Sequence, residues 1–135
     1  MSQSALTLTL LIAWALLLLV LMESLRGYLV LAGRAQSNEF KPDNSNLSPF
    51  MQRIARAHAN CIEGLPVFGG LLVVALATGR PEVTDALAPW LLGARVVQST
   101  IHLASTSVFA VNARFAAFTM QMAIGAYWVW ALLAK

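Results

Sequence analysis

The stretch Arg53-Ile-Ala-Arg-Ala-His-Ala-Asn-Cys-Ile-Glu-Gly-Leu-Pro-Val-Phe68 sets charged and amide side chains into the start of a long apolar segment. A charged residue at the centre of a membrane helix costs about 2.5 to 3.5 kcal/mol, so it usually faces a bundle interior or a cavity. Four polar residues follow one another at intervals of three, four and three positions: Arg53, Arg56, Asn60 and Glu63. At about 100° per residue, these intervals place them on one helical stripe roughly 80° wide, with His58 pointing elsewhere. The stripe is therefore able to line a polar site.

The same stripe has a second interpretation, in which its basic side chains only reach toward the lipid headgroups. Long basic side chains near a helix end often extend along apolar surface toward water. Arg53 lies close to the preceding loop, so both interpretations stay open for it. Glu63 lies roughly two or more turns deeper, where a role in a site is favoured.

The composition is that of an integral membrane protein with an all-α fold. Hydrophobic residues make up 59% of the 135 residues and charged residues only 11%. Four apolar segments are each long enough to cross a hydrocarbon layer of about 30 Å as a helix: 6–32, 48–78, 83–108 and 112–133. The sequence therefore predicts a single domain, a bundle of four transmembrane helices surrounded by membrane lipid. Glu23 and Arg26, three positions apart in the first segment, are spaced for an intrahelical ion pair.

Basic residues are distributed unevenly between the loops, and this predicts the orientation. Most of them gather around the first loop: Arg26, Arg34, Lys41, Arg53 and Arg56. Arg114 lies near the third loop, whereas the opposite side has Arg80 and Lys135. The positive-inside rule then places the first and third loops in the cytoplasm and both termini outside. Topology explains these few basic residues better than nucleic-acid binding does, despite the net charge of +3.

The polar linker 34–48 is the one extended loop, and it could order over a bound ligand. Ser48 followed by Pro49 predicts the start of the second helix, with Ser48 as the cap. Pro66 predicts a kink in that helix, with or without a functional role. Three aromatic residues near the end of the last segment predict an interfacial belt on the outer side: Tyr127, Trp128 and Trp130.

A second polar stripe runs along the third segment. Its members also fall on one helical face: Arg95, Gln98, Ser99, His102, Ser105 and Thr106. Two spans with such stripes are expected to face each other or a partner subunit, with Arg95 and Glu63 as candidates for a buried ion pair. The alternative is that these groups only make interhelical hydrogen bonds that pack the bundle. Cys61, beside the first stripe, is expected to serve as a small core residue rather than as a nucleophile.

Arg114, near the same cytoplasmic mouth, has two alternative roles. Its guanidinium could stabilise an anionic sulfur or bind a carboxylate bidentately. It could equally anchor the end of the fourth helix at the membrane interface. The residues alone leave both roles open.

The pattern Arg53-x-x-Arg56-Ala57-His58-x-Asn60-x-x-Glu63-x-x-Pro66-x-Phe68, followed by Gly93-Ala94-Arg95 and Arg114, resembles that of the MAPEG family. These are the membrane-associated proteins of eicosanoid and glutathione metabolism. The resemblance covers nearly the whole chain. It implies a left-handed four-helix bundle assembled as a homotrimer, with glutathione bound as a cosubstrate between neighbouring subunits near the cytoplasmic face.

The resemblance also implies roles for individual residues. Glutathione would be bound by three residues of one subunit: Arg56, Asn60 and Glu63. Arg34 would contact it from the neighbouring subunit, and Arg114 would be the catalytic residue that stabilises the glutathione thiolate. Arg95 would lie near the bundle centre. Arg53 belongs to the same stripe and is assigned to the binding site, as is His102, which stands where the family has a ligand-contacting Tyr but could instead be a structural polar residue.

Four residues depart from those of prostaglandin E synthase-type members: Ala59, Cys61, Phe115 and Phe118. The sequence therefore predicts a membrane glutathione transferase or peroxidase, acting on hydrophobic electrophiles or lipid hydroperoxides, rather than an eicosanoid synthase. The alternative is a non-catalytic trimeric membrane protein that keeps only the fold or the ligand pocket, since Phe115 and Phe118 lack the family's hydroxyl groups. A transporter is disfavoured, because the wholly apolar stretch 69–77 interrupts any polar pathway.

Overall fold

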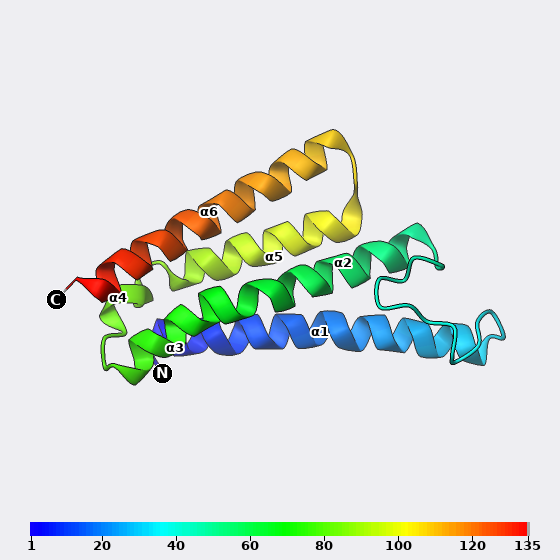
Figure 1. Cartoon of the computed structure of the whole chain (residues 1–135), viewed down its shortest axis with the longest axis horizontal. Helices are drawn as coiled ribbons and strands as arrows, with labels where there is room; N and C mark the ends of the chain where they lie inside the picture. The colour runs from blue at the N-terminus through cyan, green and yellow to red at the C-terminus, as the bar shows by residue number, and fades with distance from the viewer. Residues whose placement is uncertain (135) are drawn as a thin grey trace.

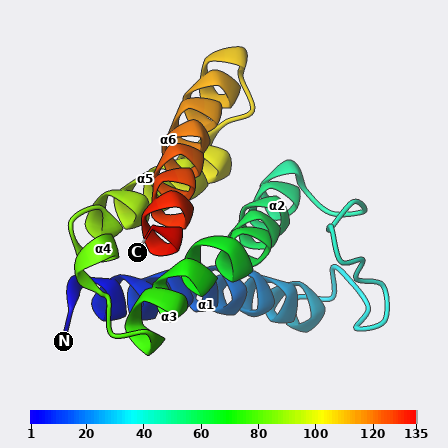
Figure 2. The same cartoon turned by 60° about the vertical axis from the view of Figure 1, so that its left-hand side comes forward.

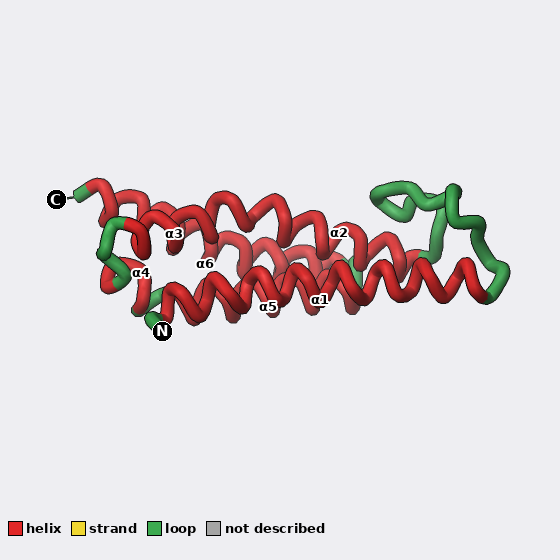
Figure 3. The backbone as a smooth tube through the Cα atoms, turned by 90° about the horizontal axis from the view of Figure 1, so that it is seen from below, coloured by secondary structure: helices red, strands yellow, loops and turns green. Residues whose placement is uncertain are grey.

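The computed structural model describes residues 1–134, and every regular element among them is helical. The four longest helices run lengthwise through the molecule: α1 (Gln3–Leu31), α2 (Pro49–Gly64), α5 (Ala88–Ala104) and α6 (Val108–Leu133). Beyond α2 the chain continues through a π-helical turn, η1 (Leu65–Gly69), into α3 (Gly70–Ala77), and the short α4 (Glu82–Asp85) leads into α5. Both termini lie at one end of the molecule, and the linker and the α5–α6 connection lie at the other (Figures 1 and 3).

Three stretches are long and apolar enough to cross a membrane: Gln3–Leu31, Pro49–Ala77 and Val108–Leu133. They correspond to the first, second and fourth predicted spans, and they support an integral membrane protein. The third predicted span, 83–108, is divided between α4 and the 17-residue α5, so its crossing of the bilayer stays a prediction. The fourth helix begins at Val108, earlier than the predicted 112, because the Ser107 hydroxyl caps it by accepting from the Ala110 N–H at 3.2 Å.

Local chemistry explains where the second helix begins and how it passes its proline. The Ser48 hydroxyl accepts from the Met51 N–H at 3.3 Å and Pro49 occupies the first turn, so the predicted start is confirmed. Pro66 has no N–H to donate back to the preceding turn. The helix accommodates that loss by widening into the five-residue π-helical turn Leu65–Gly69 rather than ending there.

The interior is arranged in three hydrophobic clusters along the bundle. The cluster nearest the termini contains the largest side chains, among them Phe68, Leu72 and Trp128. The central cluster contains small residues, including Ala15, Ala57 and Cys61, and a third cluster around Met51 lies next to the linker. Small residues at the middle let α1 and α2 approach closely. Cys61 thus lies in the core, as expected.

The prediction of a three-membered aromatic belt is wrong for Trp128. Its side chain is 0% exposed and belongs to the core cluster nearest the termini. Tyr127 and Trp130 are exposed on α6 and remain placed for an interface. The reason is helical periodicity: Trp128 follows Ile124 by four positions, so both lie on the face of α6 that packs inward.

Candidate functional site

The linker 34–48 is anchored to the helices by the buried side-chain amide of Asn44. Asn44 is 0% exposed, accepts from Arg26 Nε at 3.0 Å and donates from Nδ2 to the Met51 carbonyl at 2.7 Å. Arg26 also donates to Glu23 at 2.9 Å, which confirms the predicted ion pair. These contacts connect α1, the linker and α2. The linker is therefore an ordered part of the structure.

The ordered linker and two helices enclose a cavity of about 540 Å³, which we call the linker cavity. It is lined by Pro42, Asp43, Ser45, Pro49, Gln52, Arg53, Ala55, Arg56, Ala59, His102 and Thr106. Two predicted site residues of α2, Arg53 and Arg56, thus meet His102 of α5 here. Arg53 also donates from Nε to the Leu103 carbonyl at 2.9 Å, so it joins α2 to the end of α5. Arg56 is exposed and makes no such tie among the described residues.

A second cavity, of about 420 Å³, lies farther along α2, and we call it the midhelix cavity. It is lined by Asn60, Glu63, Gly64, Val67, Phe68, Arg95, Gln98, Phe118 and Met122. Polar groups from α2 and α5 thus face apolar side chains from α6. Val67 is 58% and Met122 42% exposed, so this cavity opens at the side of the single bundle.

Two lining residues, His102 of the linker cavity and Asn60 of the midhelix cavity, are in polar contact. Asn60 Nδ2 lies 3.3 Å from His102 Nδ1. With the Asn60 amide as donor, Nδ1 accepts and the neutral ring carries its proton on Nε2. Nearby, Cys61 Sγ lies 3.3 Å from Ser99 Oγ. The prediction that the two polar stripes face each other is confirmed.

The predicted ion pair between Arg95 and Glu63 is absent from the described residues. Arg95 is only 4% exposed and donates from Nη1 to the Asn60 carbonyl at 3.1 Å, while its Nη2 has no partner. A Cβ atom added at Gly64 would collide with Nη2, so the guanidinium lies close to the helix at Gly64. Glu63, one residue before Gly64, projects about 100° away around the helix and is exposed.

Arg114 lies on α6, six positions after the helix begins, rather than at the loop. Its side chain is half-buried and its Nε has no hydrogen-bond partner among residues 1–134. Arg114 and Arg56 are the charged neighbours of His102. Arg114 lines neither cavity, but it lies close enough to His102 for its charge to act on that ring.

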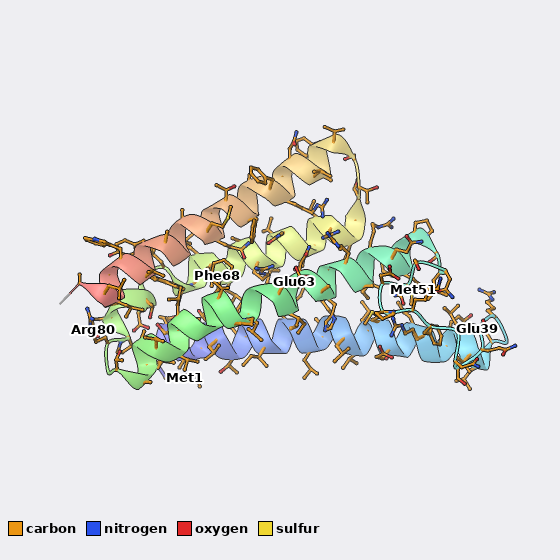
Figure 4. All side chains as sticks on the ribbon, viewed as in Figure 1. Met1, Glu39, Met51, Glu63, Phe68 and Arg80 are labelled. Carbon is orange, nitrogen blue, oxygen red and sulfur yellow. The ribbon has the colours of Figure 1, made fainter. Side chains whose placement is uncertain are left out.

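Arg34 is a predicted site residue that lies apart from the others in the single chain. It is exposed just beyond the end of α1 and lines neither cavity. Figure 4 shows Glu39 of the linker at the end of the molecule opposite the termini, with Met51 and then Glu63 along α2. A contact of Arg34 with a ligand in the linker cavity would have to come from a second copy of the chain, as the resemblance implies.

Three residues that the sequence alone did not single out lie in or beside these cavities. Asp43 and Ser45 line the linker cavity, although only a general role of the linker over a ligand was expected. Gln121 of α6 is 0% exposed and donates to Gln98 Oε1 at 2.8 Å. An amide inside the apolar stretch 115–124 was the available sign for Gln121.

Comparison with known proteins gives one result. A family model described as MAPEG family matches residues 4–134, nearly the whole chain. No curated protein and no solved structure gives a match.

Proposed function

The chain belongs to the MAPEG family, and from this membership we propose that it is a membrane-bound glutathione transferase or peroxidase. Its substrates would be hydrophobic electrophiles or lipid hydroperoxides that arrive from the bilayer. The observation that carries the proposal is the contact between residues of two neighbouring cavities. The linker cavity contains the cations Arg53 and Arg56, whereas the midhelix cavity contains Phe68, Phe118 and Met122 beside its polar groups. His102 of the first cavity contacts Asn60 of the second.

The linker cavity suits the charges of the peptide cosubstrate. Glutathione carries two carboxylates, one ammonium and one thiol. Arg53 and Arg56 in the cavity wall are able to bind carboxylates through charge-assisted hydrogen bonds. Arg34 of a neighbouring subunit would add a third cation in the homotrimer that we propose with this function.

The thiol of the bound peptide would lie toward His102 and Arg114. A free thiol has a pKa of about 8.5, and lowering it by two units requires about 2.7 kcal/mol of preferential stabilisation of the thiolate. One partly desolvated guanidinium is sufficient for that. Half-buried Arg114, whose buried Nε has no hydrogen-bond partner among the described residues, is the cation that we assign to this purpose.

The midhelix cavity would hold the second substrate. Phe68, Phe118 and Met122 supply apolar surface, and the opening toward lipid admits a molecule dissolved in the bilayer. The thiolate sulfur then bonds to the electrophilic carbon while the leaving group departs with the electron pair of its bond. Holding both reactants in these neighbouring cavities raises their effective concentration.

The experiment measures thiolate formation and conjugation in the purified protein. Glutathione is added to the protein in detergent, the ultraviolet absorbance of the thiolate is recorded, and conjugation to 1-chloro-2,4-dinitrobenzene is followed. We expect both signals in the wild type. In Arg114→Ala the thiolate absorbance and kcat should fall at least tenfold, because the cation that favours the thiolate is lost.

Arg114→Lys is the matched control, since it keeps a positive charge near the thiol, and we expect it to recover part of the thiolate signal. Full turnover in Arg114→Ala would remove Arg114 from the catalytic role. Binding of glutathione without turnover in the wild type would favour the alternative, a non-catalytic protein with the family's pocket. The side chains Phe115 and Phe118, which lack hydroxyl groups, are the reason to keep that alternative.

A further inference from the structure

The charges around the linker cavity are distributed unevenly over its walls. Its α2 wall supplies the cations Arg53 and Arg56, whereas its linker wall supplies Asp43. Among the described residues that line this cavity, Asp43 is the one carboxylate. A ligand that fits these walls carries acidic groups on one side and a cationic group on the other.

Glu63, the carboxylate that the family resemblance assigns to the peptide, is placed elsewhere. It follows Arg56 by seven positions, a rise of about 10 Å along the helix. It lines the midhelix cavity, beyond the Asn60–His102 contact, and not the linker cavity. A ligand held by Arg53 and Arg56 in the linker cavity therefore shares that cavity with Asp43 and not with Glu63.

Asp43 is held in place as a charged group. The Ser45 N–H donates to its carboxylate at 3.0 Å, and this hydrogen bond holds the pKa of Asp43 below its usual value. The next residue, Asn44, has a φ of +54°, a left-handed conformation that Asn tolerates better than most residues. Its buried amide bonds to Arg26 and to the Met51 carbonyl, so the backbone on both sides of it is anchored.

We propose that Asp43 is a specificity-determining residue that binds the ammonium group of the peptide ligand, and that Asn44 positions it as a fixed wall of the linker cavity. The inference rests on the proposed function and deepens it. It assigns selection for a cationic group to the linker rather than to α2. The Arg26–Asn44 contact then serves ligand recognition as well as folding.

The test compares two probes, glutathione and its analogue without the α-amino group, glutaryl-cysteinyl-glycine. Their Kd values are measured by calorimetry on the full-length protein in lipid nanodiscs. We expect the wild type to bind glutathione about three- to fivefold more tightly than the analogue, the range for an ion pair at an exposed carboxylate. In Asp43→Asn this preference should disappear, with the Kd of the analogue unchanged or lower.

Glu39→Gln is the matched control, because it removes a linker carboxylate outside the cavity wall and should keep the preference. Glu63→Gln tests the rival assignment to α2, and the proposal expects the preference to remain, because Glu63 lines the other cavity. Asn44→Gly keeps the left-handed backbone accessible but removes both amide ties, and it should weaken the preference while Arg53 and Arg56 still hold the analogue.

Three outcomes would overturn the inference. A preference retained in Asp43→Asn removes Asp43 from the role, and a preference lost in Glu63→Gln assigns it to α2 instead. A preference retained in Asn44→Gly removes the positioning role. Failure of the wild type to bind either probe would overturn the proposed function itself, and so the two failures are distinguishable.

Discussion

Arg95 is a cation in the core whose charge is met by a backbone carbonyl rather than by a carboxylate. Its Nη1 donates to the Asn60 carbonyl. Its guanidinium lies over the aromatic ring of Phe68, with the guanidinium carbon 5.9 Å from the ring centroid. Gly64 makes this position accessible, because any larger residue would occupy the space of Nη2. A glycine in the middle of the motif therefore has a packing reason.

Gly64→Ala should destabilise the protein by about 1 to 3 kcal/mol, because the added methyl group displaces the buried guanidinium from its carbonyl partner. For a chain of this size the thermal midpoint should fall by roughly 2 to 4 °C per kcal/mol, measured in detergent. Gly70→Ala is the matched control: it lies in a helical conformation with nothing within 4 Å of an added Cβ, so we expect no loss. If the double variant Gly64→Ala/Arg95→Met loses no more stability than Arg95→Met alone, the collision with the guanidinium is supported. If the stability losses of the two single variants simply add in the double variant, the collision is contradicted.

The helical elements are held in register by contacts at their ends. At the end of the molecule near the termini, Arg80 donates from Nη1 to the Leu132 carbonyl at 3.0 Å and from Nη2 to the Ala131 carbonyl at 3.1 Å. These are carbonyls of the last turn of α6, where helical partners run out and a cation is favoured. Arg80, placed between α3 and α4, therefore fastens α6 to the rest of the bundle.

Arg80→Ala should loosen the last turn of α6 at a cost of about 1 to 2 kcal/mol, because carbonyl groups of that turn lose a charged donor. Amide hydrogen exchange by mass spectrometry should rise in the C-terminal peptide of α6 and stay unchanged in α1. Arg34→Ala removes an exposed arginine without such ties and should leave the exchange of that peptide unaltered. Unchanged exchange in Arg80→Ala would show that water replaces the cap without loss.

Several charged side chains stay exposed on the surface of a single copy of the chain. The helix α6 packs along α5 and diverges from α1 and α2 toward the linker end (Figures 1 and 2). Three charged residues are exposed: Arg56, Glu63 and Arg34. Arg56 and Glu63 lie within the helical segment Pro49–Ala77, which is long enough to span a membrane. Charges on a lipid-facing surface are costly, which favours an assembly that covers them. The homotrimer implied by the family resemblance would do so.

A mixed oligomer tests whether Arg34 completes a site in its neighbour. Neither Arg34→Ala nor Arg56→Ala alone should turn over glutathione well, because each homotrimer lacks one cation at every site. When the two variants are co-expressed, random mixing in a cyclic assembly should restore intact pairs at about one quarter of the sites. The measurement is conjugation rate per protomer, with the separately purified variants mixed after assembly as control. No recovery on co-expression would place both arginines in the same subunit's site or remove Arg34 from it.

Particular residues show how far the sequence alone carries. Ser48, Pro49 and the Glu23–Arg26 spacing correctly predicted a cap, a helix start and an ion pair, because each depends on residues within one turn. The length and apolarity of the long segments predicted membrane helices, and the MAPEG motif predicted the family that the full-length match shows. Helical spacing also predicted that two polar stripes would face each other, as the Asn60–His102 contact confirms.

Only the tertiary structure decided which of these residues share a cavity. Spacing placed Arg56 and Glu63 on one stripe, but Arg56 lines the linker cavity together with Asp43, whereas Glu63 lines the midhelix cavity. The tertiary structure also left Arg95 without Glu63 and placed Trp128 in the core. The physical reason is that periodicity defines one face of one helix, whereas a site depends on which neighbouring elements approach that face and at what depth.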